Sequence, residues 1–175
     1  VHILGIPANL DAVMAIAKKH NLLVVEDACQ AIGAEYHGRR AGVLGSVACF
    51  SFFPTKNLGG AGDGGMMTTD DPALAARLRR LRVHGDVGQY EHLEIGMNSR
   101  LDSIQAAILG VKLPHLHGYN AARRDAANRY DALFREEALV ETPFRHHRSH
   151  HVFHQYTLVL GSVGDSSERR DAVAA

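Results

Sequence analysis

The chain has 175 residues, of which 46% are hydrophobic and 22% are charged, the composition of a globular domain long enough to bury a core. Lysine plus arginine and aspartate plus glutamate both number 19, so the formal net charge is zero. A neutral surface gives no general attraction to nucleic acid or to an anionic membrane, and we expect neither as a partner.

The cysteines and the apolar runs indicate where the protein works. Cys29 and Cys49 lie within apolar runs and form no CxxC pair, which favours reduced, buried thiols over a disulfide framework. The longest apolar runs fall well short of the ~20 residues that a membrane-spanning helix needs. We therefore expect a cytoplasmic protein.

Helix-like and strand-like segments alternate from the start of the chain. Residues 8–21 (ANLDAVMAIAKKHN) place apolar side chains at helical spacing, and Asn9 or Asp11 is the expected cap. Residues 22–28 (LLVVEDA) form a continuous apolar run, which is typical of a strand buried on both faces of a parallel sheet.

Two more strands and three more helices follow in the same rhythm. The strands are expected at residues 47–54 (VACFSFFP) and 64–70 (GGMMTTD). The helices are expected at residues 71–85, 101–116 and 119–138, the first of them capped by Asp70 or Asp71. Strands and helices in this order predict an α/β fold in which helices flank a mostly parallel sheet.

The amino-acid composition changes near the end of the chain. After Val140 a histidine-rich loop leads into an expected strand, which we interpret as the start of a small α+β domain. Residues 166–175 (SSERRDAVAA) predict the first turns of a helix, and the chain opens inside an apolar segment. We therefore expect a fragment, with residues 1–116 in a large domain and residues 117–175 forming a connecting helix and the beginning of the small domain.

Asp27 and Lys56 are the first candidate functional residues. Asp27 ends one predicted strand and Lys56 follows another, and ligands of open α/β sheets bind beyond the carboxyl ends of the strands. Burial favours the neutral, nucleophilic form of an amine, as in a lysine that forms a Schiff base. A carboxylate beside a pyridinium nitrogen keeps it protonated. Ser51 offers a hydroxyl group for a phosphate, and the glycines after Lys56 allow close approach of the backbone to a ligand.

Each of these residues also has an ordinary structural interpretation. Lys56 alone is compatible with a solvated loop, Asp27 with a helix cap, and residues 59–65 with a plain turn. The glycines match neither GxxxxGK[ST] nor GxGxxG between a strand and a helix, so a nucleotide-binding loop is not indicated.

The combination of segments resembles a known family. Residues 24–71, followed by LRVHG (81–85) and GMNSRLDSIQAAIL (96–109), are similar to the DegT/DnrJ/EryC1/StrS family of pyridoxal-phosphate-dependent aminotransferases, which act on nucleotide-linked keto-sugars. The similarity runs from Val1 to about Leu116 and resumes at HHVFHQYTLVL (150–160). It implies the fold-type I transferase fold.

The resemblance also implies roles for particular residues. Lys56 matches the lysine that forms a Schiff base with pyridoxal 5'-phosphate and then moves the substrate proton. The other implied contacts with the cofactor are Asp27 at the pyridinium nitrogen, Ala28 under the ring, Gln30 beside the phenolic oxygen, Ser51 at the phosphate, and Asn98 at the phosphate of a neighbouring subunit. Arg100 is a candidate for an anionic group of the substrate.

The implied function is the transamination of a nucleotide-linked keto-sugar to an amino sugar. Glutamate or glutamine is the expected amino donor, and a homodimer with a shared active site is the expected assembly. Two features depart from the family pattern: the Gly-Thr-Ser-type phosphate loop is absent, and most of the small domain is missing. We therefore expect this chain alone to be inactive.

Two other interpretations remain open. One is a scaffold or sensor with the same fold and no catalysis. The other is a metal site, for which the candidate ligands are His146, His147, His150, His151 and His154. Their four-residue spacings would pair imidazoles on a helix, but Pro143 and the apolar residues downstream favour a loop followed by a strand.

Overall fold

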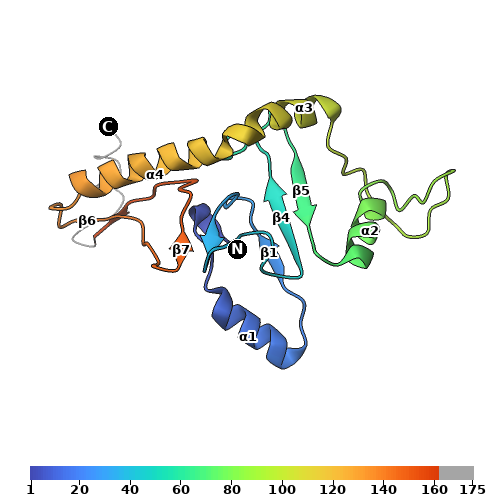
Figure 1. Cartoon of the computed structure of the whole chain (residues 1–175), viewed down its shortest axis with the longest axis horizontal. Helices are drawn as coiled ribbons and strands as arrows, with labels where there is room; N and C mark the ends of the chain where they lie inside the picture. Colours follow the sequence, from blue (N-terminus) through green and yellow to red (C-terminus); the bar gives the residue numbers. More distant parts are fainter. Residues whose placement is uncertain (162–175) are drawn as a thin grey trace.

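A small central sheet with a long helical rod packed along it forms the body of the molecule (Figure 1). The computed structural model describes residues 1–161, so the helix expected at residues 166–175 lies outside the described residues. The helices are η1 (Ile3–Gly5), α1 (Leu10–His20), α2 (Pro72–Leu81), α3 (Ser103–Lys112), η2 (Leu113–His115) and α4 (Leu116–Leu133). The strands are β1 (Val25–Asp27), β2 (Glu35–Tyr36), β3 (Arg39–Arg40), β4 (Val47–Ser51), β5 (Gly65–Thr68), β6 (Val140–Glu141), β7 (Ser149–His150) and β8 (Val159–Leu160).

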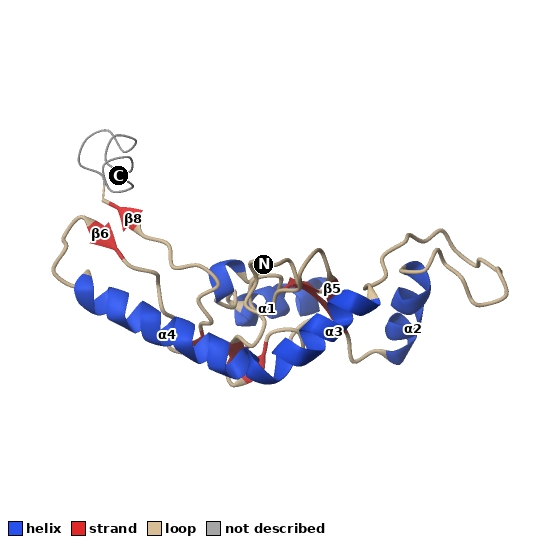
Figure 2. Ribbon diagram, turned by 90° about the horizontal axis from the view of Figure 1, so that it is seen from above, coloured by secondary structure: helices blue, strands red, loops and turns tan. Residues whose placement is uncertain are grey.

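The central sheet has the strand order β1-β4-β5 and confirms the α/β prediction. Strands β1 and β4 are parallel, whereas β4 and β5 are antiparallel, so within residues 1–161 this sheet is mixed rather than mostly parallel. The reason is the connection between β4 and β5, which is a loop without a crossover helix; a parallel return requires such a crossover. Two smaller sheets have the strand orders β3-β2-β7 and β6-β8, and the second lies near the end of α4 that is far from the central sheet (Figures 1 and 2).

Side-chain caps define where the first two helices begin. The side chain of Asn9 accepts a hydrogen bond from Ala12 N at 3.3 Å and caps α1. Asp71 accepts from the N–H groups of Ala73 and Leu74, which follow Pro72 at the start of α2. Both arrangements satisfy N–H groups that have no partner inside the helix, and both confirm a cap expected from the sequence.

Helices α3 and α4 form one nearly continuous rod, joined by η2 at Pro114 (Figure 2). Proline lacks the N–H group that a helix ladder requires, so the two helices meet at a tight turn instead of merging. Buried Leu109 of α3 packs against Phe52 and Leu58, which flank the Lys56 turn. Within residues 1–161, no helix has both the length and the apolar character needed to cross a bilayer.

The main core cluster is unusually rich in small side chains. Five of its seven buried members are alanines; the cluster consists of Ala28, Ala31, Ala34, Ala41, Ala48, Phe50 and Val152. Alanine side chains let the backbones of β1, β4 and the segment between them approach closely. The histidine-rich segment forms β7 and then runs as extended chain to β8, which agrees with the predicted loop and only in part with the predicted strand.

The carboxylate of Glu26, on β1 of the central sheet, is buried, with 2% of the residue exposed. It accepts hydrogen bonds from three backbone N–H groups, those of Gly42 at 2.9 Å and of Leu44 and Gly45 at 2.6 Å. Burial by itself raises the pKa of Glu26, but the hydrogen bonds from His2 and from these N–H groups lower it to about 2 from the ordinary 4.5. Glu26 is therefore ionised at neutral pH.

His2 is the fourth donor to this carboxylate, and its tautomer is fixed by its neighbours. Its Nδ1 atom accepts a hydrogen bond from Ala8 N at 3.1 Å, so the proton lies on Nε2, which donates to Glu26 at 3.0 Å. The backbone N–H of His2 donates to the carbonyl of Asp27 at 2.9 Å. One residue thus links the start of the chain to both acidic residues at the end of β1.

We predict that Glu26→Gln lowers the free energy of unfolding at pH 7 by roughly 3 kcal/mol. The new amide would place an NH2 group where a carboxylate oxygen now accepts, so the N–H groups that donate to this oxygen would lose their acceptor. Because folding lowers the pKa of Glu26, its contribution is complete above pH 4.5 and is lost as the pH falls toward about 2. Urea unfolding of both proteins at several pH values measures this effect.

Glu94→Gln is the matched control, since Glu94 pairs with Arg77 and Arg80 near the surface. Its cost should stay below about 1 kcal/mol. Equal costs for the two substitutions, or a Glu26 contribution that persists at pH 2, would contradict this account.

Candidate functional site

The carboxyl ends of β1 and β4 present one open face of the central sheet. Asp27 is in register with Cys49, and Ser51 lies two residues further along β4, so these three side chains share a face. Each of the three is half-buried. The alternate residues, such as Glu26 and Ala48, are buried on the opposite face. Parallel pairing therefore brings Asp27 and Ser51 to the same edge of the sheet, as the sequence predicts.

Lys56 lies in a turn just beyond this edge. Its backbone N–H donates to the carbonyl of Phe53 at 2.9 Å, and its side chain is half-buried. On either side of the turn, Phe52 and Leu58 are buried against Leu109 of α3. Two buried apolar side chains, one before and one after Lys56 in the sequence, thus hold the turn in place.

The thiol of Cys29 shows how Asp27 and Lys56 are placed. Burial and the Asp27 carboxylate together raise the pKa of Cys29 to about 11, and the Lys56 ammonium opposes them. Hydrogen bonds from the side chain and backbone N–H of Cys29 lower the pKa of Asp27. The ionised Asp27 carboxylate and the Lys56 amine therefore both lie near the Cys29 thiol. The sequence predicts that these two groups lie beyond the carboxyl ends of neighbouring strands.

Gln30 and Ala28 line the segment that follows β1. The side-chain carbonyl of Gln30 accepts from Leu4 N at 2.6 Å, in a turn where Leu4 adopts a positive φ of 60°. Because an N–H donor faces this carbonyl, the amide NH2 points the other way, where none of the described residues accepts from it. Ala28 is buried, and its N–H donates to Cys49 O at 2.9 Å.

The glycines after Lys56, residues 59–65, serve the packing of the chain on itself. A Cβ atom on Gly59 would lie 2.3 Å from the carbonyl oxygen of Pro54, and one on Gly65 would lie 2.8 Å from that of Phe50. Both distances are too short for any side chain. Gly59 thus lets the loop fold back onto the lysine turn, and Gly65 lets β5 lie close against β4.

Asn98 and Arg100 lie on a separate, exposed loop between α2 and α3, which extends away from the sheet at the right of Figure 1. The side-chain carbonyl of Asn98 accepts from Arg100 Nε at 3.1 Å, and the backbone of Asn98 bridges to Val83. Neither side chain contacts Asp27 or Lys56 among the described residues. The fold therefore does not bring them into the site within one chain.

The histidine-rich segment holds a residue whose position the sequence did not reveal. Burial lowers the pKa of His154, and the charges of Lys56 and Arg123 lower it further, so His154 lies within the range of the Lys56 charge. Its buried Nδ1 atom has no hydrogen-bond partner among residues 1–161. The only sequence signal for this placement was the similarity of residues 150–160 to the family.

The other histidines of this segment have structural contacts. His151 stacks on Phe153 with ring centroids 3.8 Å apart and accepts from its N–H, and burial lowers the pKa of His151 to about 4. His146 and His147 stack on each other. In the part of the chain that the structure describes, no three histidine, cysteine or acidic side chains meet as a metal site would require.

Comparison with known proteins identifies the family of the chain. The model of the DegT/DnrJ/EryC1/StrS aminotransferase family matches residues 1–175, and the chain belongs to that family. Members of the family use pyridoxal 5'-phosphate, and the similar solved structure of NtdA from Bacillus subtilis, 29% identical over 99% of this chain and 39% of its own with a TM-score of 0.82, is described with bound cofactor PMP.

Two curated relatives and one solved structure illustrate the similarity. The chain is 48% identical, over 99% of its length, to the UDP-N-acetyl-3-dehydro-alpha-D-glucosamine 3-aminotransferase of Acidithiobacillus ferrooxidans, of which it covers 45%. It is 52% identical, over 90% of its length, to a pleiotropic regulatory protein of Geobacillus stearothermophilus, of which it covers 43%. DesV of Streptomyces venezuelae, in complex with a ketimine intermediate, has a TM-score of 0.90 and 44% identity over 98% of this chain and 44% of its own. The chain thus spans less than half the length of these proteins.

We predict that Gly59→Ala lowers the free energy of unfolding by roughly 2 kcal/mol or more, because the new methyl group overlaps the Pro54 carbonyl and displaces the lysine turn. Gly110→Ala is the control: this glycine lies within α3 and has no atom within 4 Å of an added Cβ. It should raise stability by up to about 1 kcal/mol. Thermal unfolding compares the stabilities of the two variants. If Gly59→Ala leaves the stability unchanged, the loop does not require the close approach of Gly59 to the Pro54 carbonyl.

Proposed function

We propose that the whole protein is a pyridoxal-phosphate-dependent aminotransferase that converts the keto group of a nucleotide-linked sugar to an amino group. The observation that carries this proposal is the position of the Asp27 carboxylate and the Lys56 amine around Cys29, beyond the carboxyl ends of β1 and β4. The names of the curated relatives support the substrate class. Glutamate or glutamine is the proposed donor.

The described residues fit the cofactor. Bound there, it would supply an aldehyde that takes up an amino group and a ring that accepts an electron pair. Asp27 is ionised and half-buried, and would hold a proton on the ring nitrogen. The hydroxyl of Ser51 accepts from Phe53 N at 3.3 Å and keeps its own proton for a phosphate oxygen. The free NH2 of Gln30 would contact the ring oxygen, and buried Ala28 would pack under the ring.

Lys56 has two tasks in this proposal. Its amine would hold the cofactor covalently, and when free it would move a proton at the reacting carbon of the substrate. The buried anchors Phe52 and Leu58 keep its turn in place during both tasks. Free Cys29 and Cys49 support a reducing, cytoplasmic setting, and we retain a domain division near residue 116 as a proposal.

We predict that borohydride reduction of the cofactor-loaded protein attaches the pyridoxyl group to Lys56. Lys56→Arg keeps the positive charge but cannot form the imine, so turnover should fall more than about a thousandfold. Peptide mass mapping locates the adduct, and Lys112→Arg is the control that should leave the labelling of Lys56 intact. An adduct at Lys18, Lys19 or Lys112 instead would refute the assignment.

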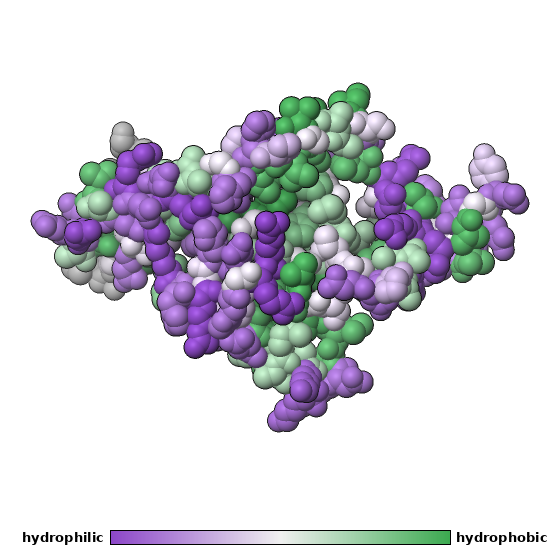
Figure 3. Space-filling model, in the orientation of Figure 1, coloured by the Kyte–Doolittle hydropathy of each residue, from purple (hydrophilic) through white to green (hydrophobic). Residues whose placement is uncertain are grey.

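We also propose that the protein is a homodimer in which Asn98 reaches the cofactor phosphate of the neighbouring subunit and Arg100 reaches the substrate. The exposed apolar side chains around this loop support an interface: Ile95 is 99% exposed and Met97 is 65% exposed. Apolar side chains also gather over α3, at the top of Figure 3. Twofold pairing would bring the same loop to both sites.

A mixture of inactive subunits tests the shared site. A dimer of one Lys56→Ala subunit and one Asn98→Ala subunit has one site with neither defect if the site is shared, and none if it is not. Equal mixing should then restore roughly a quarter of the normal activity. If subunit exchange is verified by mass spectrometry and activity does not return, Asn98 does not serve the neighbouring site.

A regulatory role without turnover is the second candidate, because one curated relative is named a pleiotropic regulatory protein. Cofactor attachment at Lys56 without any amino transfer to a panel of nucleotide-linked keto-sugars would favour it over the aminotransferase.

A further inference from the structure

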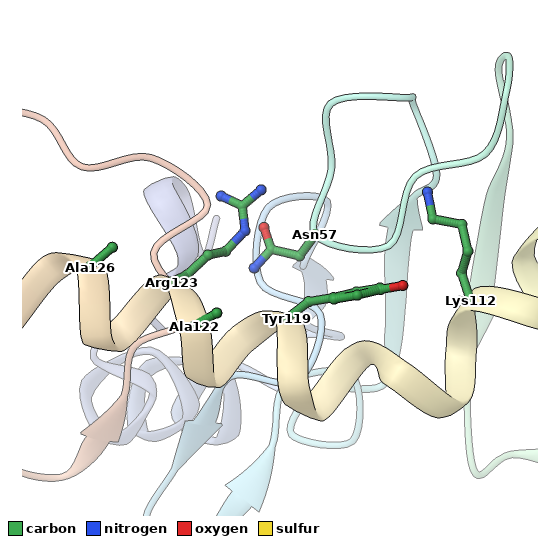
Figure 4. A pocket seen from close by; sticks show the side chains of 6 residues that line it. All are labelled: Asn57, Lys112, Tyr119, Ala122, Arg123 and Ala126. Carbon is green, nitrogen blue, oxygen red and sulfur yellow. The ribbon is translucent and has the colours of Figure 1, made fainter.

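Two asparagine side chains meet in the interior between the lysine turn and α4. Asn57 directly follows Lys56, and Asn120 lies on α4; 6% of Asn57 and 3% of Asn120 are exposed. Figure 4 shows Asn57 on the loop that faces this helix. We call the two side chains the asparagine pair. Asparagine is mostly exposed in folded proteins, and neither residue has a role in the cofactor contacts proposed above, so the buried pair needs its own explanation.

The hydrogen bonds of the asparagine pair determine the orientation of both amides. Asn57 Nδ2 donates to Asn120 Oδ1 at 2.7 Å and to Val152 O at 3.0 Å. Asn120 Nδ2 donates to Ile32 O at 3.0 Å. Each nitrogen faces a carbonyl oxygen, so turning either amide round would place like atoms against each other. The pair therefore has one arrangement.

These bonds join the two segments that carry the candidate cofactor contacts. Ile32 belongs to the segment that follows Asp27, and Asn57 belongs to the turn that holds Lys56. Asn120 is bonded to both segments, so a single side chain of α4 links them.

The backbone beside Ile32 is adapted to this link. Gly33 has a φ of +82°, which glycine adopts without steric cost, and a Cβ atom at this position would lie 2.6 Å from Asn120 Nδ2. Any other residue at position 33 would therefore displace the amide. The glycine and the buried amide serve the same contact.

The asparagine pair supplies a directional contact that the apolar packing around the turn does not. Phe52 and Leu58 pack against Leu109, and such packing is non-directional. Hydrogen bonds, by contrast, require a defined distance and angle. The pair therefore restricts movements of the turn that the apolar contacts alone would allow.

Stability by itself does not explain the pair. Asn57 Oδ1 is buried and has no donor among residues 1–161, and a buried acceptor without a partner costs free energy. Two apolar side chains of similar shape would avoid this cost, but they would not fix one segment relative to the other.

We propose that Asn120, acting through Asn57 and the backbone of Ile32, is a positioning residue that fixes the Lys56 amine relative to the Asp27 carboxylate. This inference rests on the proposed function, in which Asp27 holds a proton on the ring nitrogen and Lys56 moves a proton at the reacting carbon. A misplacement of about 1 Å costs such a step roughly a hundredfold.

The first test is the reaction of the whole, cofactor-loaded protein with L-glutamate or L-glutamine, whichever is faster, followed by the absorbance of the cofactor. In Asn120→Ala the limiting rate should fall at least about tenfold, while the half-saturating donor concentration stays within about threefold, because Lys56 is displaced and the donor site is not. A rate within about twofold of the unchanged protein overturns the proposal.

Two control variants separate position from stability. Asn128→Ala makes the same change on the exposed side of α4, where Asn128 Oδ1 accepts from Arg145 Nη1. Leu10→Ala removes buried packing from a separate core cluster and therefore destabilises the protein elsewhere. Both should keep the limiting rate within about twofold. If Leu10→Ala loses as much rate as Asn120→Ala, the effect is one of stability and the positioning role is wrong.

A second substitution tests whether the pair acts as a unit, and it serves if Asn120→Ala does not fold. Asn57→Ala removes the same link from the other side and should show the same loss of rate with little change in half-saturation. In the double variant the loss should stay within about threefold of the larger single loss. Losses that multiply would show that the two residues act independently, which contradicts the proposal.

Hydrogen exchange measures the link without any turnover, and thus separates this inference from the proposed function. The N–H groups of Ala31 and Lys56 donate to Ala28 O and Phe53 O, one on each side of the link. Both should exchange at least about tenfold faster in Asn120→Ala, and Leu10→Ala should not reproduce both increases. Faster exchange with no amino transfer by the unchanged protein supports the link and refutes the reaction. Unchanged exchange at both N–H groups overturns the positioning role whatever the activity.

Discussion

The arrangement of the site depends on one buried carboxylate. Glu26 and Asp27 are neighbours on β1 and point to opposite faces of the central sheet. Glu26 ties the strand to the segment 42–45 through three backbone N–H groups and to His2 through a fourth donor. Because an ionised, buried group tolerates little displacement of its donors, the end of β1 is held in one position, and with it the carboxylate that faces the open side.

Stability and chemistry are thus divided between the two faces of the same short strand. The closed face contains Glu26 and the small side chains of the alanine cluster. The open face contains half-buried groups that keep unused hydrogen-bonding capacity, such as the hydroxyl of Ser51. A second set of polar contacts, centred on Asn57 and Asn120, joins the lysine turn to α4 in the same way. Asp27 and the Lys56 turn are therefore each supported by neighbouring contacts that are buried, whereas Asn98 and Arg100 lie on an exposed loop.

Local patterns in the sequence predicted the elements whose signals are local. The caps at Asn9 and Asp71 follow from residue type and spacing, and β1, β4 and β5 follow from apolar runs bounded by glycine or proline. The two-residue strands β2 and β3 were missed because such short segments show no alternation. The antiparallel direction of β5 was missed because strand direction depends on the connection rather than on the strand itself.

The contacts that organise the site were not predictable from local patterns. His2 meets Glu26 across 24 positions of the chain, and Asn57 meets Asn120 across 63. The placement of Asp27, Ser51 and Lys56 at one edge was predicted, because it requires only the order of the strands and the rule that ligands bind at their carboxyl ends. The position of His154 near Lys56 was not, since the residue is brought there by the return of the chain after α4.

The rod formed by α3, η2 and α4 has a mechanical consequence. It starts just after the exposed loop that carries Asn98, passes the lysine turn at Leu109, and further on holds the carbonyls of Phe153 and His154 through Arg123. The rod therefore joins three places that are far apart in the sequence, and it borders the lysine turn on one side through Leu109 and the His154 segment on the other through Arg123. A substitution that shifts this rod would disturb both neighbours of the lysine turn at once.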